Sequence, residues 1–399
     1  RRQRQMCIRD RYWNALVKGQ CGIDYITRFD TSDMPVKVAA EVKDFDPSVF
    51  MPKSLSRTMD LFSQFAYAAA EEAIKDSGLD INAESDRIGI VMGSAMNGIS
   101  TIAETQTALD SGKRVNPRFV PKIIGNIGAA QIAISHGIHG PSLTLNTACS
   151  TGGDAIMTAA MLLRAGEADA VLAVGGENAL CPVVVSGLTQ AGALSKQSED
   201  PALACRPFDI NRDGFVMGEG GGAVIIETEK HALARGANIY AELAGYANTS
   251  DAHHVTAPMP DGAGAARCMK LALKRAGMNP SEIDYINAHG TSTPLGDKAE
   301  TTAVKTVFGG KEGAPPMSST KSMTGHLMGA GGLTEAIACV MAVKEGILPP
   351  TIHLEAPDPD CDLDYVPNQA RRKDIKAAMS NSLGFGGQNS SIIVSRYEK

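Results

Sequence analysis

One cysteine stands where a strand would meet a helix. Residues 142–145 alternate polar and apolar side chains, which predicts a strand, and residues 154–163 are rich in strong helix formers. Cys149 lies between them on a sharp turn. At a helix N-terminus, free N–H groups and the helix dipole favour negative charge. We therefore expect Cys149 to have a lowered pKa and to act as a thiolate nucleophile, although an isolated cysteine is more often a small core residue.

Two histidines on glycine-flanked turns are candidates for polar catalysis. His289 ends a predicted strand over residues 283–288, and His326 opens a segment of small residues. A lone histidine is commonly structural, but two in such settings favour a chemical role. Two neutral imidazoles can donate N–H bonds to one carbonyl oxygen and so stabilise an enolate. Lys321 and Glu335 could orient or tune these rings, and a simple ion pair is an equally good interpretation of them.

A third glycine-rich segment surrounds an aromatic residue near the end of the chain. Residues 381–390 contain Phe385 among three glycines, and Gln388 follows them. The backbone N–H of Phe385 could join that of Cys149 in an oxyanion hole. Taken alone, the segment is more simply interpreted as a turn that lets chain segments approach closely.

Composition indicates an α/β enzyme and argues against several other classes. The chain has 399 residues, of which 43% are hydrophobic, 5% are aromatic and 41 are glycine. A net charge of −6 does not suit a nucleic-acid-binding protein. The eight cysteines lack Cys-x-x-Cys spacing, which argues against a disulfide framework or a zinc site and favours a reducing compartment. No membrane-length apolar run or signal peptide is present, so we expect a cytoplasmic protein without membrane association.

A faint internal repeat indicates two similar halves. A predicted helix near 57–77 ends at Gly78 and is followed by a strand reaching Gly93, and a helix near 264–276 ends at Gly277 and is followed by a strand reaching Gly290. We expect an N-terminal half over residues 12–236 and a C-terminal half over 237–399, with the site at their junction. The arginine-rich residues 1–11 have no predicted strand or helix.

The ordered set of motifs resembles the β-ketoacyl-acyl carrier protein synthases over roughly residues 12–397. The set consists of a turn-mounted Cys149, His289 and His326 in glycine turns, Lys321 five residues before the second histidine, and a terminal Gly-Phe-Gly-Gly loop. Within the family, the set looks like that of the type II elongating enzyme of fatty acid synthesis, or of a near relative in polyketide pathways. The resemblance implies a thiolase-like fold of two related α/β halves in five αβαβα layers. It also implies a homodimer, an acyl carrier protein as partner, and no metal or redox cofactor.

The resemblance also implies residue roles. Cys149 would accept the acyl chain, His289 and His326 would promote decarboxylation of the malonyl thioester, Lys321 and Glu335 would support the histidines, and Phe385 would gate the acyl pocket. The expected binding residues are Thr291 and Thr293 for the phosphopantetheine arm, Ile124 and Gly125 where the acyl pocket meets the dimer interface, and Lys53, Arg57, Arg206 and Arg212 for docking of an acidic carrier.

The implied reaction is decarboxylative Claisen condensation in fatty acid elongation. The alternatives are a ketosynthase of a polyketide or aryl-polyene pathway, a non-catalytic chain-length partner subunit, and a thiolase-like enzyme. The presence of Cys149 argues against the non-catalytic subunit, and residues 384–386 lack the second cysteine of thiolases. Two departures from the family concern residues 1–11, where relatives begin with an apolar strand and a glycine-rich turn, and Gln388, where threonine is common. The preferred acyl chain length and unsaturation stay open.

Overall fold

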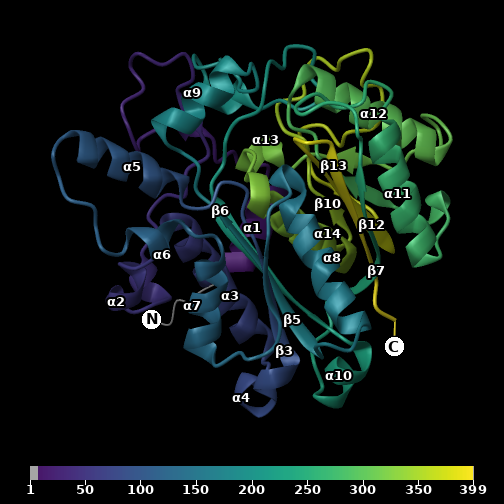
Figure 1. Cartoon of the computed structure of the whole chain (residues 1–399). Coiled ribbons are helices and arrows are strands. Elements are labelled where there is room, and N and C mark those ends of the chain that lie inside the picture. The colour runs from purple at the N-terminus through teal and green to yellow at the C-terminus, as the bar shows by residue number, and fades with distance from the viewer. Residues whose placement is uncertain (1–7, 399) are drawn as a thin grey trace, which may run out of the picture.

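Two mixed β-sheets form the framework of the molecule, in a computed structural model that describes residues 8–398 (Figure 1). The first sheet has the order β4-β3-β5-β6 and the second has the order β7-β13-β12-β8-β9. Their strands are β3 (Ile88–Gly93), β4 (Ser142–Leu145), β5 (Ala170–Glu177), β6 (Gly220–Glu227), β7 (Glu242–Ser250), β8 (Tyr285–Asn287), β9 (Met317–Ser318), β12 (Ala377–Gly384) and β13 (Gln388–Ser395).

The two sheets repeat one topology. In the first, β3 is parallel to β4 and β5, and β6 is antiparallel to β5. In the second, β8 is parallel to β9 and β12, and β13 is antiparallel to β12. Strands β4, β3, β5 and β6 therefore correspond to β9, β8, β12 and β13. This correspondence confirms the two related α/β halves that the glycine spacing predicted.

Helices complete five layers around the sheets. The central layer lies between the sheets, and each outer layer covers the far face of one sheet, as the contacts between helices and strands show (Figure 1). The central helices are α8 (Thr151–Arg164) and α14 (Gly331–Glu345), and the outer ones are α3 (Leu61–Ser77) and α7 (Asn126–His136) on the first sheet, and α11 (Ala263–Ala276) and α12 (Pro294–Phe308) on the second.

One predicted boundary was wrong because a side-chain cap decides where the helix begins. The helix predicted near 57–77 begins at Leu61, since Asp60 caps α3 by accepting from the Phe62 N–H at 3.1 Å. Farther along the chain, α6 (Phe119–Ile123) and α7 are separated at Ile124, whose backbone is extended. Short helices complete the set, including α2 (Lys53–Ser56), α5 (Ile99–Asp110), α9 (Pro182–Gln190), α10 (Glu229–Ala234) and α13 (Lys321–Thr324).

The prediction that the arginine-rich residues 1–11 form no strand or helix was wrong for residues 8–11. Residues 8–11 form the start of helix α1 (Ile8–Val17), where no element was predicted. Arg9 donates to Asp76 at 2.9 Å and also contacts Tyr240, so partners distant in sequence stabilise this start. The rest of that prediction, residues 1–7, lies outside the described residues.

The halves differ at one sheet edge. Strand β7 pairs with β13 at the edge of the second sheet, whereas within residues 8–398 no strand pairs with the outer edge of β6. A cavity of about 1290 Å³ runs along that edge, and its lining includes residues of β6, α3, α14, α1 and β7. The first sheet is thus the less complete of the two.

Glycines at the starts of α8 and α14 bring the halves into backbone contact. A Cβ atom on Gly152 would lie 2.7 Å from the backbone nitrogen of Leu333, and one on Gly332 would lie 2.5 Å from that of Gly153. Real side chains do not tolerate such distances to backbone atoms. The two central helices can therefore meet this closely only because these positions carry no side chain.

This contact predicts a sharp difference between adjacent glycines. We expect Gly332→Ala to lower stability by about 1–3 kcal/mol, because the added methyl group overlaps the backbone of α8. Gly331→Ala is the matched control, since a Cβ there meets its nearest atoms at 3.9 Å. Thermal and urea unfolding of both variants would measure the difference. Equal stability of the two would contradict the close contact.

Candidate active site

Cys149 and His326 occupy corresponding places in the two halves. Cys149 lies in the 3-10 turn Ala148–Ser150 that leads from β4 into α8. His326 lies just before the 3-10 turn Met328–Ala330 that leads into α14, between β9 and β12. Because α8 and α14 touch at their N-termini, the repeat brings both residues to the same junction (Figure 1).

His289 completes the group from the end of β8. The sulfur of Cys149 and a ring nitrogen of each histidine all lie within 4.8 Å of one another. The two imidazole rings are almost perpendicular, with centroids 5.3 Å apart and an interplanar angle of 88°. The structure therefore brings together three residues that are up to 177 positions apart in the sequence.

Backbone hydrogen bonds hold each histidine in place. The N–H groups of His289 and Gly290 donate to the Glu300 carboxylate at 2.9 and 2.8 Å. The N–H of His326 donates to the Val216 carbonyl at 2.7 Å. Burial raises the pKa of Glu300 to about 7, although both N–H groups oppose this shift. Glu300 was not anticipated from the sequence, where the only signal was a second acidic residue three positions after Asp297, on one face of the following helix.

Both imidazoles are held in the neutral form. Burial lowers the pKa of His289 and of His326 well below the usual range, and the positive charge of Lys321 lowers both further. Both side chains are buried, and Nδ1 of His289 and both ring nitrogens of His326 have no protein hydrogen-bond partner. These buried nitrogens therefore have hydrogen-bonding capacity that the described residues do not use.

Lys321 and Glu335 form a buried ion pair beside the histidines. Nζ of Lys321 donates to Oε1 of Glu335, and both side chains are almost fully buried. Burial raises the pKa of Glu335, and Lys321 opposes this shift. The two interpretations left open by the sequence are thus compatible, since Lys321, while paired with Glu335, also lowers the pKa of both imidazoles.

The expected lowering of the Cys149 pKa was wrong. Burial raises the pKa of the thiol to about 11, and the carboxylates of Glu177 and Glu335 add to the shift. The Phe385 N–H and the charge of Lys321 act in the opposite direction but do not overcome it. A helix N-terminus favours a thiolate only where desolvation is small, and here desolvation is the larger effect.

The Phe385 turn joins β12 to β13 and approaches the sulfur. Gly386 and Gly387 have φ values of 84° and 71°, a left-handed conformation that favours glycine. A Cβ atom on Gly384 would lie 3.2 Å from the Cys149 backbone nitrogen, so Gly384 permits the approach. The Phe385 ring is 37% exposed, and Gln388 is the first residue of β13, paired with Ser250.

The other expected binding residues differ in exposure, from buried Thr291 to exposed Ile124. The hydroxyl groups of Thr291 and Thr293 lie 3.1 Å apart, just before α12. Ile124 and Gly125 separate α6 from α7, and Ile124 is partly exposed. A Cβ atom on Gly125 would collide with the Asn97 side chain at 2.3 Å.

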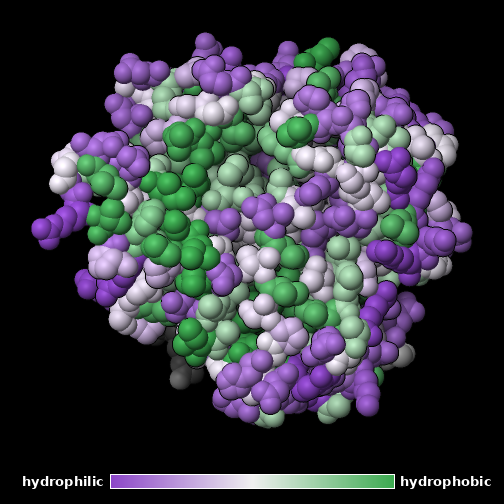
Figure 2. Space-filling view, viewed as in Figure 1, coloured by the Kyte–Doolittle hydropathy of each residue, from purple (hydrophilic) through white to green (hydrophobic). Residues whose placement is uncertain are grey.

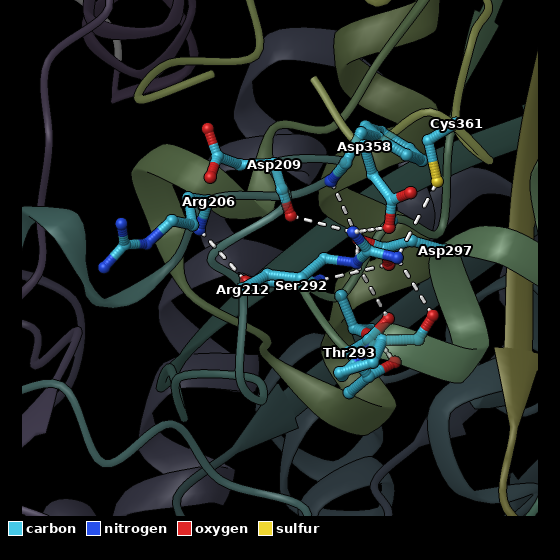
Figure 3. A network of polar contacts seen from close by, with 12 residues as sticks. Arg206, Asp209, Arg212, Ser292, Thr293, Asp297, Asp358 and Cys361 are labelled. Carbon is cyan, nitrogen blue, oxygen red and sulfur yellow. Dashed lines mark hydrogen bonds and ion pairs between the residues drawn. The ribbon is translucent and has the colours of Figure 1, made fainter. Parts of the chain in front are cut away.

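The four expected carrier-docking residues divide into two groups. Lys53 and Arg57 are exposed at α2, and Arg206 is half-buried. Arg212 is buried, and its guanidinium bonds Asp358 at 2.7 Å and lies 3.3 Å from Asp297 (Figure 3). The surface role expected for Arg212 was therefore wrong, because its charge is used to hold the 206–212 loop against the start of α12.

The cysteine and both histidines have donor atoms that some metals bind. Sulfur and imidazole nitrogens within 4.8 Å of one another resemble a partial zinc ligand set. The expectation that no metal is required stays a prediction. In residues 8–398, no helix is long and apolar enough to cross a membrane.

Comparison with known proteins agrees with this site. The profile described as "Beta-ketoacyl synthase, N-terminal domain" matches residues 5–232, and that of the C-terminal domain matches residues 240–355. The chain is 47% identical over 390 residues to "3-oxoacyl-[acyl-carrier-protein] synthase 2" of Synechocystis, which covers 97% of this chain and 94% of the relative.

Solved structures agree as well. A β-ketoacyl synthase from Burkholderia phymatum superimposes with a TM-score of 0.89 at 34% identity, covering 96% of this chain and 94% of the other. A type II polyketide ketosynthase solved with its acyl-carrier protein and a hexaketide has a TM-score of 0.87 at 33% identity, covering 98% and 95% of the two chains. The matched profiles, the repeated thiolase-like topology and the Cys-His-His junction together place the chain in the β-ketoacyl synthase family.

Proposed function

We propose that this chain condenses an enzyme-bound acyl group with malonyl-acyl carrier protein and releases a 3-oxoacyl carrier protein in fatty acid elongation. The observation that carries the proposal is the convergence of the Cys149 sulfur and two neutral imidazoles within 4.8 Å. As an acyltransferase of this kind, the enzyme needs a nucleophile and a site for an enolate, and this junction supplies both.

The first half-reaction transfers the acyl chain to Cys149. Because the thiol is protonated at neutral pH, it must lose its proton as the sulfur attacks the acyl thioester. A neutral imidazole nearby can accept this proton. The N–H groups of Cys149 and Phe385 bind the oxyanion, the carrier thiolate leaves, and the leaving sulfur takes up the proton.

The second half-reaction forms the carbon–carbon bond. His289 and His326 donate N–H bonds to the thioester oxygen of malonyl carrier protein. Loss of CO₂ then leaves its electron pair in an enolate held by both rings. The enolate carbon attacks the Cys149 thioester, the bond between carbon and sulfur breaks, and the released thiolate takes up a proton from the solvent. In this scheme Lys321 and Glu335 position the rings, the charge of Lys321 helps to keep them neutral, and no metal or redox cofactor takes part.

The alternatives fit less well. A non-catalytic partner subunit would not require a cysteine packed against two unpartnered imidazoles. A thiolase would require a second cysteine near residues 384–386, where none occurs. Polyketide ketosynthases share the fold, but the curated relatives named for the fatty acid reaction are more similar in sequence, at 46–47% identity.

The carrier protein and a second copy of this chain are the proposed partners, in the cytoplasm. Lys53 and Arg57 offer exposed positive charge for an acidic carrier, with Arg206 nearer the binding threonines. Thr291 and Thr293 would contact the phosphopantetheine arm, and Phe385 would gate the acyl pocket next to Ile124 and Gly125.

An exposed apolar face supports the homodimer. Figure 2 shows hydrophobic residues gathered on the face that carries α9, α6 and α7 in the view of Figure 1. The exposed apolar side chains Ile134 of α7, Leu143 of β4 and Met161 of α8 belong to elements that contact one another. Strand β4 is also an edge of its sheet, and an open edge is a template for pairing with a second chain.

The two half-reactions predict separable effects of one substitution. Cys149→Ala should lower condensation at least about 1,000-fold, since no covalent acyl-enzyme can form, while CO₂ release from malonyl carrier protein persists on the intact histidines. Mass spectrometry of the peptide containing residue 149, and radiolabelled CO₂ release, would measure the two steps. Acylation of Cys149→Ala, or full condensation by it, would contradict the assignment.

The lowered imidazole pKa values predict an unusual pH dependence. A free histidine gains a proton near pH 6.5, but His289 and His326 stay neutral there, so CO₂ release should be flat between about pH 8 and 6. Unfolded chains bind those protons while the folded enzyme does not, so stability should fall as the pH drops below about 6.5. Rate profiles and urea titrations at several pH values check both. A half-maximal rate near pH 6.5 would show that the rings titrate normally.

The apolar face predicts how the dimer can be disrupted. Ile134→Glu together with Leu143→Glu should convert the protein to monomers, because a stable interface cannot bury unpaired carboxylates. Leu233→Glu on α10, also at an exposed leucine, is the matched control. Sedimentation velocity distinguishes the species, and a wild-type monomer at micromolar concentration would refute the dimer.

A further inference from the structure

We infer that Asp154 is a positioning residue that holds the nucleophile turn, and this inference rests on the proposed function of Cys149. Asp154 lies in the first turn of α8 and is only 2% exposed. It does not touch the sulfur. Its carboxylate instead contacts residues on both sides of the Ala148–Cys149 dipeptide.

Two side chains that flank the dipeptide converge on one carboxylate oxygen. The Thr147 hydroxyl donates to Oδ2 of Asp154 at 2.6 Å. The Ser150 hydroxyl lies 3.1 Å from the same oxygen and 2.8 Å from the carbonyl oxygen of Thr147. The carboxylate thus ties the start of the turn to its end, with the nucleophile between them.

The turn needs such support because its backbone is strained. Ala148, directly before the nucleophile, has a φ of 50°, a left-handed conformation that residues with a side chain rarely adopt. Strained residues persist where the surroundings hold them, and they are often found at active sites. Within this turn, Thr151 Oγ1 also accepts from the Thr147 N–H at 2.8 Å and donates to the Ala148 carbonyl at 2.6 Å.

A third contact ties the turn to the half that carries the histidines. The Asn248 side-chain amide, on β7 of the second sheet, lies 2.9 Å from both Asp154 oxygens. The sulfur comes from the first half and both imidazoles come from the second. Asp154 therefore links the nucleophile turn to the C-terminal half, which carries His289 and His326. Loss of this link should displace the Cys149 sulfur far more than the two imidazole rings.

The experiment compares the two half-reactions in Asp154→Asn and Thr147→Val. We expect both variants to slow acyl transfer to Cys149, and its alkylation by iodoacetamide, about 10-fold or more, because small displacements of a nucleophile cost large rate factors. CO₂ release from malonyl carrier protein should stay within about 2-fold of wild type. Thr147→Ser keeps the hydroxyl and should restore the wild-type rates.

Asp60→Asn is the matched control for general destabilisation. Asp60 is also a buried aspartate at a helix N-terminus in the first half, and it likewise accepts from a threonine hydroxyl, that of Thr101. It should lower the melting temperature without changing the ratio of the two half-reactions.

Two outcomes would overturn the positioning role. One is an unchanged acylation rate in Thr147→Val. The other is an equal loss in both half-reactions that follows the folded fraction measured by circular dichroism. If the wild-type protein neither acylates nor decarboxylates, the proposed function fails instead. Alkylation of Cys149, which needs no substrate, then still decides whether Asp154 positions the sulfur.

Discussion

Burial of His289, His326 and the Lys321–Glu335 pair beside a partly exposed Cys149 is the constraint on which the site depends. It keeps His289 and His326 neutral, and in the proposed reaction their N–H groups would bind a forming enolate without carrying a charge of their own. It also raises the pKa of the Cys149 thiol. The Lys321–Glu335 pair is tolerated there because each charge compensates the other.

The same burial explains why acyl transfer to Cys149, in the proposed reaction, needs a base. A protonated nucleophile requires a base, and neutral imidazoles close to the sulfur are available as bases. In the proposed reaction the same rings would then donate hydrogen bonds to the enolate. A neutral imidazole has one ring nitrogen that can accept a proton and one N–H that can donate a hydrogen bond. The same two histidines can therefore act first as base and then as donor.

Local patterns were sufficient to predict the elements that carry the chemistry. The Cys149 turn, the strand before His289 and the paired halves were all visible as periodicity and glycine spacing. Properties that depend on tertiary burial were not predictable in this way. The sign of the Cys149 pKa shift was wrong because desolvation comes from segments distant in sequence, and Arg212 was placed on the surface although Asp297 and Asp358 enclose it. Glu300 and Asp154 were missed because their partners are backbone groups and hydroxyls that no spacing rule identifies.

The glycine contact between α8 and α14 has a consequence for how this enzyme tolerates change. Peptide atoms of Gly152 and Gly153 meet those of Gly332 and Leu333, with no side chain between them. A contact of this kind has no rotamers and cannot repack when neighbouring residues are exchanged. This backbone contact fixes the distance between the starts of α8 and α14. The side chains of the surrounding cores can therefore change while the distance from the Cys149 sulfur to the two imidazoles stays the same.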